Sequence, residues 1–201
     1  MKEHIIEEAT KLFVQYGLKA IRMDDIAAQL GVSKRTIYEI FGDKENLIYE
    51  CMNHYYDYLR EEKEKLMAQA SNIIEEFVLL FQNWEVETDV NYKLMMNLKR
   101  FYPNVYNKLM ASHSHEGYES LKLKLQKGIE EGYLLKNVNY DLAISVFTYS
   151  IYGIISNQKA ILPTNVSEKE AFKYVVTYFF RGISTEKGRQ MIDAYLDKEI
   201  I

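Results

Sequence analysis

Cysteine and proline are almost missing from this sequence, whose 201 residues include one Cys and two Pro. The single cysteine, Cys51, cannot form a disulfide within the chain, which fits a reducing compartment such as the cytoplasm. Two prolines and nine glycines leave few residues for the tight turns of a β-sandwich or barrel. These shortages argue against a disulfide-stapled secreted domain and against an all-β fold.

Long apolar runs and a strong net charge are also absent. The longest nearly apolar run, residues 142–155, is too short to cross a bilayer. Residues 1–10 carry Lys and Glu side chains where a signal peptide has its apolar core. The net charge is −4, so bulk charge gives no sign of a nucleic-acid partner. We therefore expect a cytoplasmic protein with no membrane partner.

Apolar residues recur at helical spacing along almost the whole chain. Ile6, Ala9, Phe13 and Tyr16 follow steps of three and four, which predicts a first helix that Gly17 ends. Further helices are expected over 44–70, 72–87, 90–101, from Pro103 to about 132, and over 140–157 and 168–183. The predicted fold class is all-α.

Residues 22–41 have the pattern of two short helices joined by a tight turn. Gly31 is suited to the left-handed position that ends the first helix, and Ser33 is suited to cap the second, 34–41. Each helix has one apolar face, and these faces comprise Ile26, Ala27 and Leu30 and then Ile37, Ile40 and Phe41. This pattern is a helix-turn-helix.

The outer face of the second short helix is polar and partly basic. Lys34 and Arg35 lie at its N-terminal end, the end that meets base edges when such a helix enters a major groove. Lys44 is the first residue of the next helix. Its charge adds there to the positive end of the helix dipole, which favours binding of a DNA phosphate. Residues 1–47 contain seven Lys and Arg against eight Asp and Glu, so a solvated helix face is the alternative interpretation.

The same segment resembles the DNA-binding domain of the TetR/AcrR family of bacterial transcriptional regulators. Residues at the family's spacing are Gly17, Ile26-Ala27, Gly31-Val32-Ser33-Lys34, Thr36-Ile37-Tyr38, Phe41, Lys44-Glu45 and Leu47. The resemblance covers about the first quarter of the chain. It implies an N-terminal three-helix DNA-binding domain over 1–47, with the helix-turn-helix at about 22–41. A C-terminal helical domain for effector binding and dimerisation would follow over 48–201.

The resemblance also implies which residues contact DNA. Lys34, Thr36, Tyr38 and Lys44 fall where family members touch it, and Tyr38 would donate its hydroxyl to a phosphate. Two positions depart from the family: Arg22 replaces a capping threonine and Arg35 replaces a glycine. Glu39 would either accept from a cytosine amine or repel phosphate. The predicted DNA-binding set is Arg22, Lys34, Arg35, Thr36, Tyr38, Glu39 and Lys44.

Aromatic residues and methionines are concentrated after residue 47. Residues 48–201 hold 15 of the 17 Tyr, seven of the nine Phe and six of the eight Met. Such residues suit an adaptable apolar pocket, although for any single residue ordinary core packing is the favoured explanation. With the resemblance they imply a small-molecule sensor whose candidate lining residues are Phe77, Phe81, Trp84, Tyr92, Met95, Met96, Phe101, Tyr118 and Tyr149.

The two predicted helices over 140–157 and 168–183 are apolar on more than one face. A helix of this kind must bury both sides, so one side is expected to face a second copy of the chain in a two-fold dimer. The candidate interface residues are Ala143, Phe147, Ser150, Ile151, Ile154, Phe172, Val175 and Phe179.

Together with these patterns, the resemblance to the TetR/AcrR family implies a ligand-responsive transcriptional regulator. It would be a repressor that binds a near-palindromic double-stranded DNA operator as a homodimer and is released by an unidentified small-molecule effector. A ligand-independent activator or architectural DNA-binding protein is the alternative. We expect no enzyme, cofactor or metal, because no phosphate-binding glycine loop, ligand set or nucleophile–base pair is recognisable. The polar cluster 113–116 has too few ligands for a metal, and Cys51 is interpreted as a packing residue.

Overall fold

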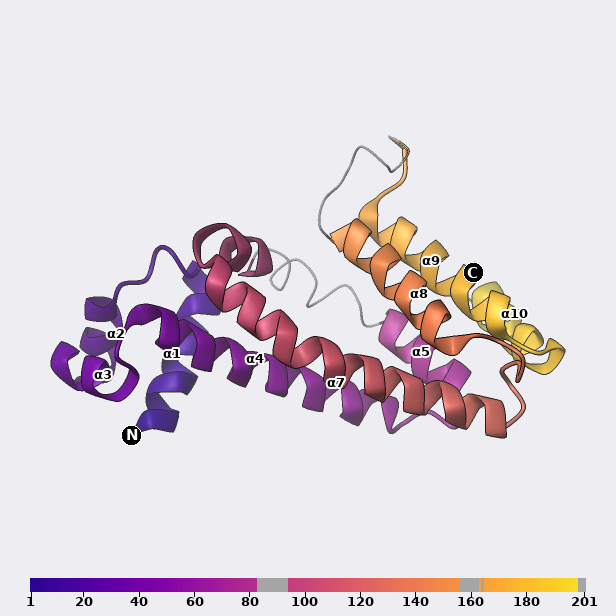
Figure 1. Ribbon diagram of the computed structural model, residues 1–201, viewed down its shortest axis with the longest axis horizontal. Helices are drawn as coiled ribbons and strands as arrows, with labels where there is room; N and C mark the ends of the chain where they lie inside the picture. The colour runs from indigo at the N-terminus through magenta and orange to yellow at the C-terminus, as the bar shows by residue number, and fades with distance from the viewer. Residues whose placement is uncertain (83–93, 156–162, 164, 199–201) are drawn as a thin grey trace. The chain divides into compact units, whose positions relative to one another are not determined.

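The computed structural model describes residues 1–82, 94–155, 163 and 165–198, and these residues fold into helices joined by short turns (Figure 1). The helices divide into two compact units, one built from residues 1–64 and 85–114 and the other from 65–84 and 115–201. An isolated antiparallel bridge joins Leu134 and Ser184 in the second unit. The predicted all-α fold is confirmed.

The first unit begins with three short helices, α1 (Lys2–Tyr16), α2 (Met23–Leu30) and α3 (Lys34–Phe41). Most of α4 (Lys44–Met67), a helical stretch over 94–101 and the first part of α7 (Pro103–Glu130) complete it. The second short helix of the helix-turn-helix spans the residues that the sequence predicts. The predicted extension of α4 to residue 70 is wrong, because the backbone turns after Met67.

The turn between α2 and α3 is fixed by two local signals. Gly31 has φ 65° and ψ 25°, a left-handed conformation that costs glycine little. Ser33 then caps α3, since its hydroxyl accepts a hydrogen bond from the Thr36 backbone N–H at 3.0 Å. Both assignments agree with the sequence prediction, and they set the direction in which α3 leaves α2.

The core of the first unit is built where apolar faces of all its helices meet. Ile26 of α2, Ile37 of α3 and Leu47 of α4 are completely buried in it. On α1 the buried residues are Ile5, Ala9, Thr10 and Phe13. The expectation for Tyr16 is wrong, because the buried stripe advances in steps of four from Ile5 and leaves Tyr16 56% exposed.

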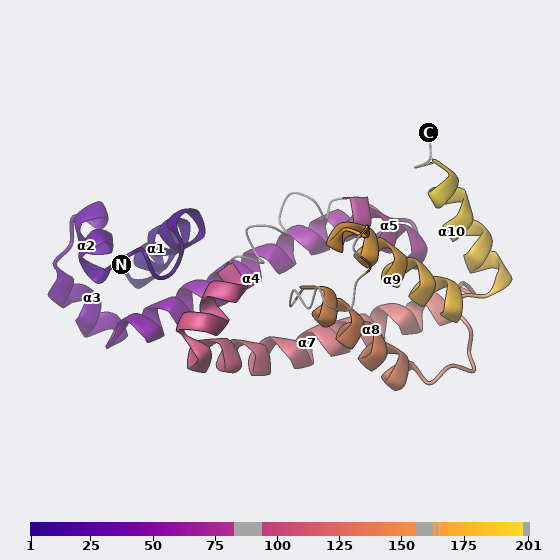
Figure 2. The same cartoon turned by 90° about the horizontal axis from the view of Figure 1, so that it is seen from above.

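The second unit consists of α5 (Ile73–Gln82), the rest of α7, α8 (Tyr140–Ile155), α9 (Glu168–Ile183) and α10 (Glu186–Lys198). Figure 2 shows α8 and α9 lying side by side. The predicted bounds of α9 are confirmed, and the described residues of the predicted helices 72–87 and 140–157 are helical from Ile73 and Tyr140. The remainder of those two ranges lies outside the described residues.

The last helix, α10, is missing from the sequence prediction. It buries Ile192 in a cluster with Phe180 of α9 and Ile73 of α5. It also approaches the backbone very closely at Gly188, where a Cβ atom would lie 2.3 Å from the carbonyl oxygen of Tyr133. Glycine at this position therefore lets α10 pack against the turn that follows α7.

Candidate nucleic-acid interface

The exposed side of α3 carries the polar residues that the sequence predicts for DNA contact. Ile37 and Phe41 are buried on the opposite side of the helix, which leaves Lys34, Arg35 and Glu39 exposed. Tyr38 is also exposed, at 41%, so its phenol faces solvent. An α-helix with this division of faces has the dimensions to enter a major groove.

Lys34, at the first position of α3, forms an ion pair with α2. Its Nζ lies 2.9 Å from Oδ2 of Asp24 in the first turn of that helix. The hydrogen bond to the Asp24 carboxylate raises the pKa of the Lys34 ammonium, which keeps this side chain protonated. Both side chains are exposed, so water and salt screen the pair and it adds little to stability.

Arg35 and Glu39 form a second ion pair one turn apart on α3. Nε of Arg35 donates to Oε1 of Glu39 at 2.8 Å. The sequence suggested that Glu39 accepts from cytosine or repels phosphate, and the structure adds a third role, since the carboxylate already holds a guanidinium.

Arg22 and Thr36 are engaged in capping contacts. Arg22 occupies the residue before α2, and its backbone N–H donates to Oδ2 of Asp25 at 2.7 Å while its side chain does not cap. The Thr36 hydroxyl lies 2.8 Å from that of Ser33, so part of its hydrogen-bonding capacity serves the cap of α3. The exposed Arg22 side chain is the more accessible of these two predicted contacts.

Lys44 is held against the turn between α1 and α2. Its Nζ donates to the carbonyl oxygen of Leu18 at 2.8 Å and lies 5.6 Å from the centre of the Tyr102 ring. The Tyr102 hydroxyl reaches the same carbonyl oxygen at 3.5 Å. Sequence reasoning missed Leu18 and Tyr102, because a contact across 84 residues leaves no local pattern.

This position of Lys44 allows its predicted phosphate role to be tested. Lys44→Met keeps the apolar stem and removes the charge, so we expect a lower melting temperature and a shallower salt dependence of DNA affinity. For one lost phosphate contact the slope of log K against log salt falls by about 0.9 per chain. Fluorescence anisotropy over a salt series measures it.

The matched control for this measurement is Lys19→Met. Lys19 lies over the Phe101 ring at 4.6 Å and is not among the predicted DNA contacts, so its replacement should leave the slope unchanged. If Lys44→Met keeps the wild-type salt slope, Lys44 does not contact phosphate. Its role would then be structural, through the hydrogen bond to the Leu18 carbonyl oxygen.

The predicted effector residues fall in different units. Met95, Met96 and Phe101 belong to the first unit, where the sulfur of Met95 accepts a hydrogen bond from Tyr56. Phe77 and Tyr118 belong to the second, and Tyr149 there is 77% exposed. Neither unit by itself therefore gathers the predicted set into one pocket. Trp84, Tyr92 and the Phe81 side chain lie outside the described residues.

Contacts within the second unit account for Phe77 and Tyr118. The Phe77 ring lies 3.7 Å, centre to centre, from that of Phe180 on α9. The Tyr118 hydroxyl donates to the Asp141 carboxylate at the start of α8. Phe77 also lines an apolar cavity between α5, α9 and α10, but its volume of about 50 Å³ is room for one or two waters rather than an effector.

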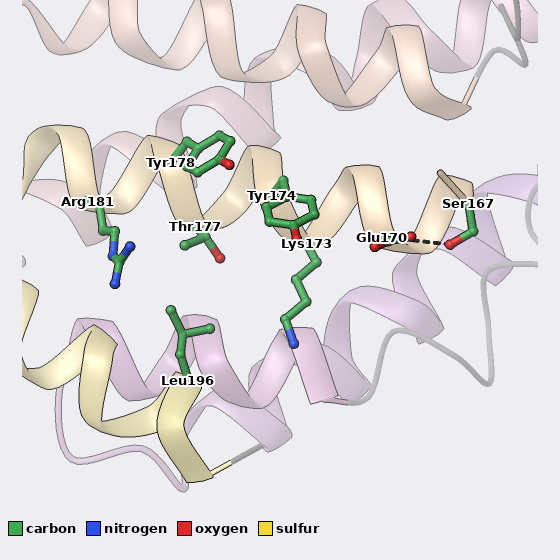
Figure 3. A pocket seen from close by; sticks show the side chains of 8 residues that line it. All are labelled: Ser167, Glu170, Lys173, Tyr174, Thr177, Tyr178, Arg181 and Leu196. Carbon is green, nitrogen blue, oxygen red and sulfur yellow. Dashed lines mark hydrogen bonds between the residues drawn. The ribbon is translucent and has the colours of Figure 1, made fainter. Parts of the chain in front are cut away.

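A larger hollow follows the outer side of α9 (Figure 3). This groove has a volume of about 650 Å³ and is open to solvent. Lys173 and Arg181 extend across it from α9 towards the side on which Leu196 of α10 lies. Nε of Arg181 donates to Asp193 of α10 at 2.9 Å. None of the predicted effector residues lines the groove.

Most of the predicted dimer residues pack inside the chain itself. The rings of Phe147 and Phe179 stack 4.4 Å apart between α8 and α9. Ile154 and Phe172 are buried in a second cluster between these helices, with Ile151 and Val175 against it, and Ala143 and Ser150 are half-buried. The exposed apolar residues of α8 are instead Leu142, Val146, Tyr149 and Tyr152. The predicted interface residues and the exposed apolar residues of α8 are therefore different sets, because the sequence of a helix that is apolar all round does not indicate which side is exposed.

No helix in the described part of the chain is long and apolar enough to span a membrane. No group of three or more His, Cys, Asp or Glu suited to a metal ion occurs among the described residues either.

A three-helix head, whose third helix has a buried aliphatic side and an exposed polar side, defines the class of helix-turn-helix DNA-binding proteins. Residues 5–51 match the sequence model described as "Bacterial regulatory proteins, tetR family". Residues 5–51 are thus a domain of the TetR family of bacterial regulatory proteins.

Several relatives resemble the chain over most of its length. The uncharacterized HTH-type transcriptional regulator YvaF of Bacillus subtilis (strain 168) is 24% identical over 93% of this chain and 97% of its own. The HTH-type transcriptional repressor KstR2 of Mycobacterium tuberculosis (strain ATCC 25618 / H37Rv) is 25% identical over 69% of this chain and 71% of its own.

A solved structure shows the same fold. The crystal structure of a transcriptional regulator from Saccharomonospora viridis, in complex with choline, has a TM-score of 0.68 and 16% identity. The match covers 92% of this chain and 98% of the other.

Proposed function

We propose that the protein is a ligand-responsive repressor that binds a near-palindromic operator as a homodimer. The observation that carries this proposal is the exposed face of α3, where Lys34, Arg35 and Tyr38 lie opposite the completely buried Ile37. Two such helices, related by a two-fold axis, would read half-sites in successive major grooves about 34–36 Å apart.

A division of labour along the chain belongs to the same proposal. Residues 1–47 would bind DNA, with Arg22, Lys34, Arg35, Thr36, Tyr38, Glu39 and Lys44 as the contacting set. Residues 48–201 would bind the effector and form the dimer. The repressor KstR2 among the relatives supports the direction of control.

The exposed stripe of α8 supports the dimer. Leu142, Val146 and Tyr149 are 57–77% exposed and share one side of the helix, because they are spaced by four and three residues. Apolar side chains gathered on one surface mark an interaction site. A two-fold arrangement would place the stripe of one chain against the same stripe of its partner.

An effector would act by favouring one spacing of the two α3 helices. It can do so only if it binds with different affinity to the dimer conformation that fits the operator and to the conformation with another α3 spacing. The choline bound to the Saccharomonospora viridis regulator supports a small-molecule effector, and the groove along α9 has the volume of a typical ligand site. The predicted aromatic and methionine residues do not line this groove, and they remain candidates for an effector site elsewhere in residues 48–201.

Selection of bound sequences from random duplexes tests this function. We expect the wild-type chain to enrich an inverted repeat, and a panel of metabolites and drugs to include a compound that releases it. Enrichment of a repeat that no compound releases would favour the ligand-independent alternative. Failure to enrich any inverted repeat would refute the proposal.

A further inference from the structure

Arg35 and Glu39 form a pre-arranged pair on the exposed face of α3. Their side chains are 87% and 60% exposed, and Nε of Arg35 donates to Oε1 of Glu39 at 2.8 Å. Residues four apart on a helix are neighbours on its surface, so the contact requires no distortion of α3. Glu39 thereby limits the directions in which the guanidinium can point.

The hydrogen bond to Glu39 occupies the Nε–H donor of the guanidinium and leaves the N–H donors of its two terminal nitrogens available. An arginine side chain has five N–H donors in a planar fork, and Nε supplies one of them. With Nε bonded to Glu39, the two terminal nitrogens still offer a pair of parallel donors. A pair of donors at this spacing matches O6 and N7 of guanine on the major-groove edge, the commonest specific contact in protein–DNA complexes.

We propose that Arg35 reads a guanine in each operator half-site and that Glu39 is the positioning residue that orients it. This inference rests on the proposed DNA-binding function and names the base that α3 selects. It also replaces both sequence-based roles of Glu39. A carboxylate that holds Arg35 is not the direct acceptor for cytosine, and its charge is balanced by the bound guanidinium.

The charges of α3 support a division between affinity and selectivity. Arg35 and Glu39 together carry no net charge, so the pair adds little to the long-range attraction of phosphate. Lys34 differs, since its ammonium is a point charge without a fork and its partner Asp24 lies on α2. Arg35 should therefore govern which base is preferred. Joint replacement of Arg35 and Glu39 by alanine, which keeps the net charge of α3, should leave the salt dependence of binding nearly unchanged.

The experiment measures base preference in variants of the full-length protein. The operator selected by the wild-type chain is altered one base pair at a time in one half-site, and affinities are measured for wild type, Arg35→Ala, Glu39→Ala and Asp24→Asn. Asp24→Asn is the matched control, because it breaks a different exposed ion pair of the head. All three substituted positions are exposed, and a melting curve for each variant verifies that it folds.

The expected result is one guanine per half-site whose replacement costs wild type about 5- to 150-fold in affinity, the range of a good bidentate contact. Arg35→Ala should abolish this preference and Glu39→Ala should reduce it several-fold. Asp24→Asn should leave it intact. In the Arg35→Ala background, Glu39→Ala should have no further effect on base preference.

Each of four results would overturn the inference. Glu39→Ala that strengthens binding to every sequence and keeps the guanine preference would assign Glu39 to phosphate repulsion. A loss of cytosine preference on Glu39→Ala in the Arg35→Ala background would make Glu39 a direct reader. An enriched inverted repeat with no guanine sensitive to Arg35 would refute the guanine contact alone, whereas no enriched repeat would refute the proposed function with it.

Discussion

Val146→Asp is expected to yield monomers that no longer hold the operator at concentrations at which wild type does. Val146 is 57% exposed at the centre of the α8 stripe, so in a two-fold dimer the substitution would bury two like charges without partners. Burial of an unpaired charge costs several kcal/mol. Loss of the linked second half-site then removes about two to four orders of magnitude in apparent affinity.

Sedimentation velocity at micromolar concentration measures the dimer, and the melting temperature verifies the fold. Leu123→Asp is the matched control, because Leu123 is an exposed apolar residue on α7, at 71% against 57% for Val146, and lies outside the stripe. Phe147→Asp is not suitable, since the Phe147 ring stacks on Phe179 within the chain and its loss would unfold the unit. A monomeric wild type, or a dimeric Val146→Asp protein, would exclude α8 as the interface.

Ile37→Ala is expected to destabilise the three-helix head by about 2–5 kcal/mol, the usual cost of this truncation in a packed core. Ile37 is completely buried and belongs to the core cluster that also contains buried residues of α1 and α2. The matched control is Ile40→Ala, which removes the same atoms from a half-buried position on the same helix and should cost less.

Denaturant unfolding followed by circular dichroism measures both variants, and DNA affinity at low temperature reports whether α3 still presents its exposed face. Equal losses of stability for the two substitutions would contradict the division of α3 into a buried and an exposed side.

The sequence predicts the three-helix head well because its signals are local. Gly31 and Ser33 set the turn through their own conformations, and Ile37 and Phe41 show which side of α3 is buried. Each of these features depends on residues within a few positions of one another. A local pattern of this kind needs no knowledge of the distant chain.

The contacts made by the polar residues of the head could not be predicted in the same way. Lys34 pairs with Asp24 on another helix, and Lys44 shares the Leu18 carbonyl with Tyr102. Such pairs depend on how helices pack and on which rotamer a long side chain adopts. Residue spacing predicts neither the packing of the helices nor the rotamers of their side chains.

The second unit was harder to predict for two physical reasons. Helix α8 is apolar on all sides, so periodicity alone does not distinguish the side that carries Phe147 from the side that carries Val146. Helix α10 has the opposite character, because charged residues surround its apolar positions. The spacing of Met191, Ile192, Tyr195 and Leu196 is nevertheless that of a half-buried helix, and it was the signal that could have identified α10.

The one thiol of the chain has a practical consequence. Cys51 is completely buried in α4, and burial raises the pKa of its thiol to about 12. Because the thiolate is the reactive form, maleimide dyes should not react with Cys51 in the folded protein. In a Gln29→Cys variant, where the new thiol is exposed, the fluorophore would therefore attach only at position 29. Energy transfer between two labelled copies could then follow the separation of their heads as an inducer is added.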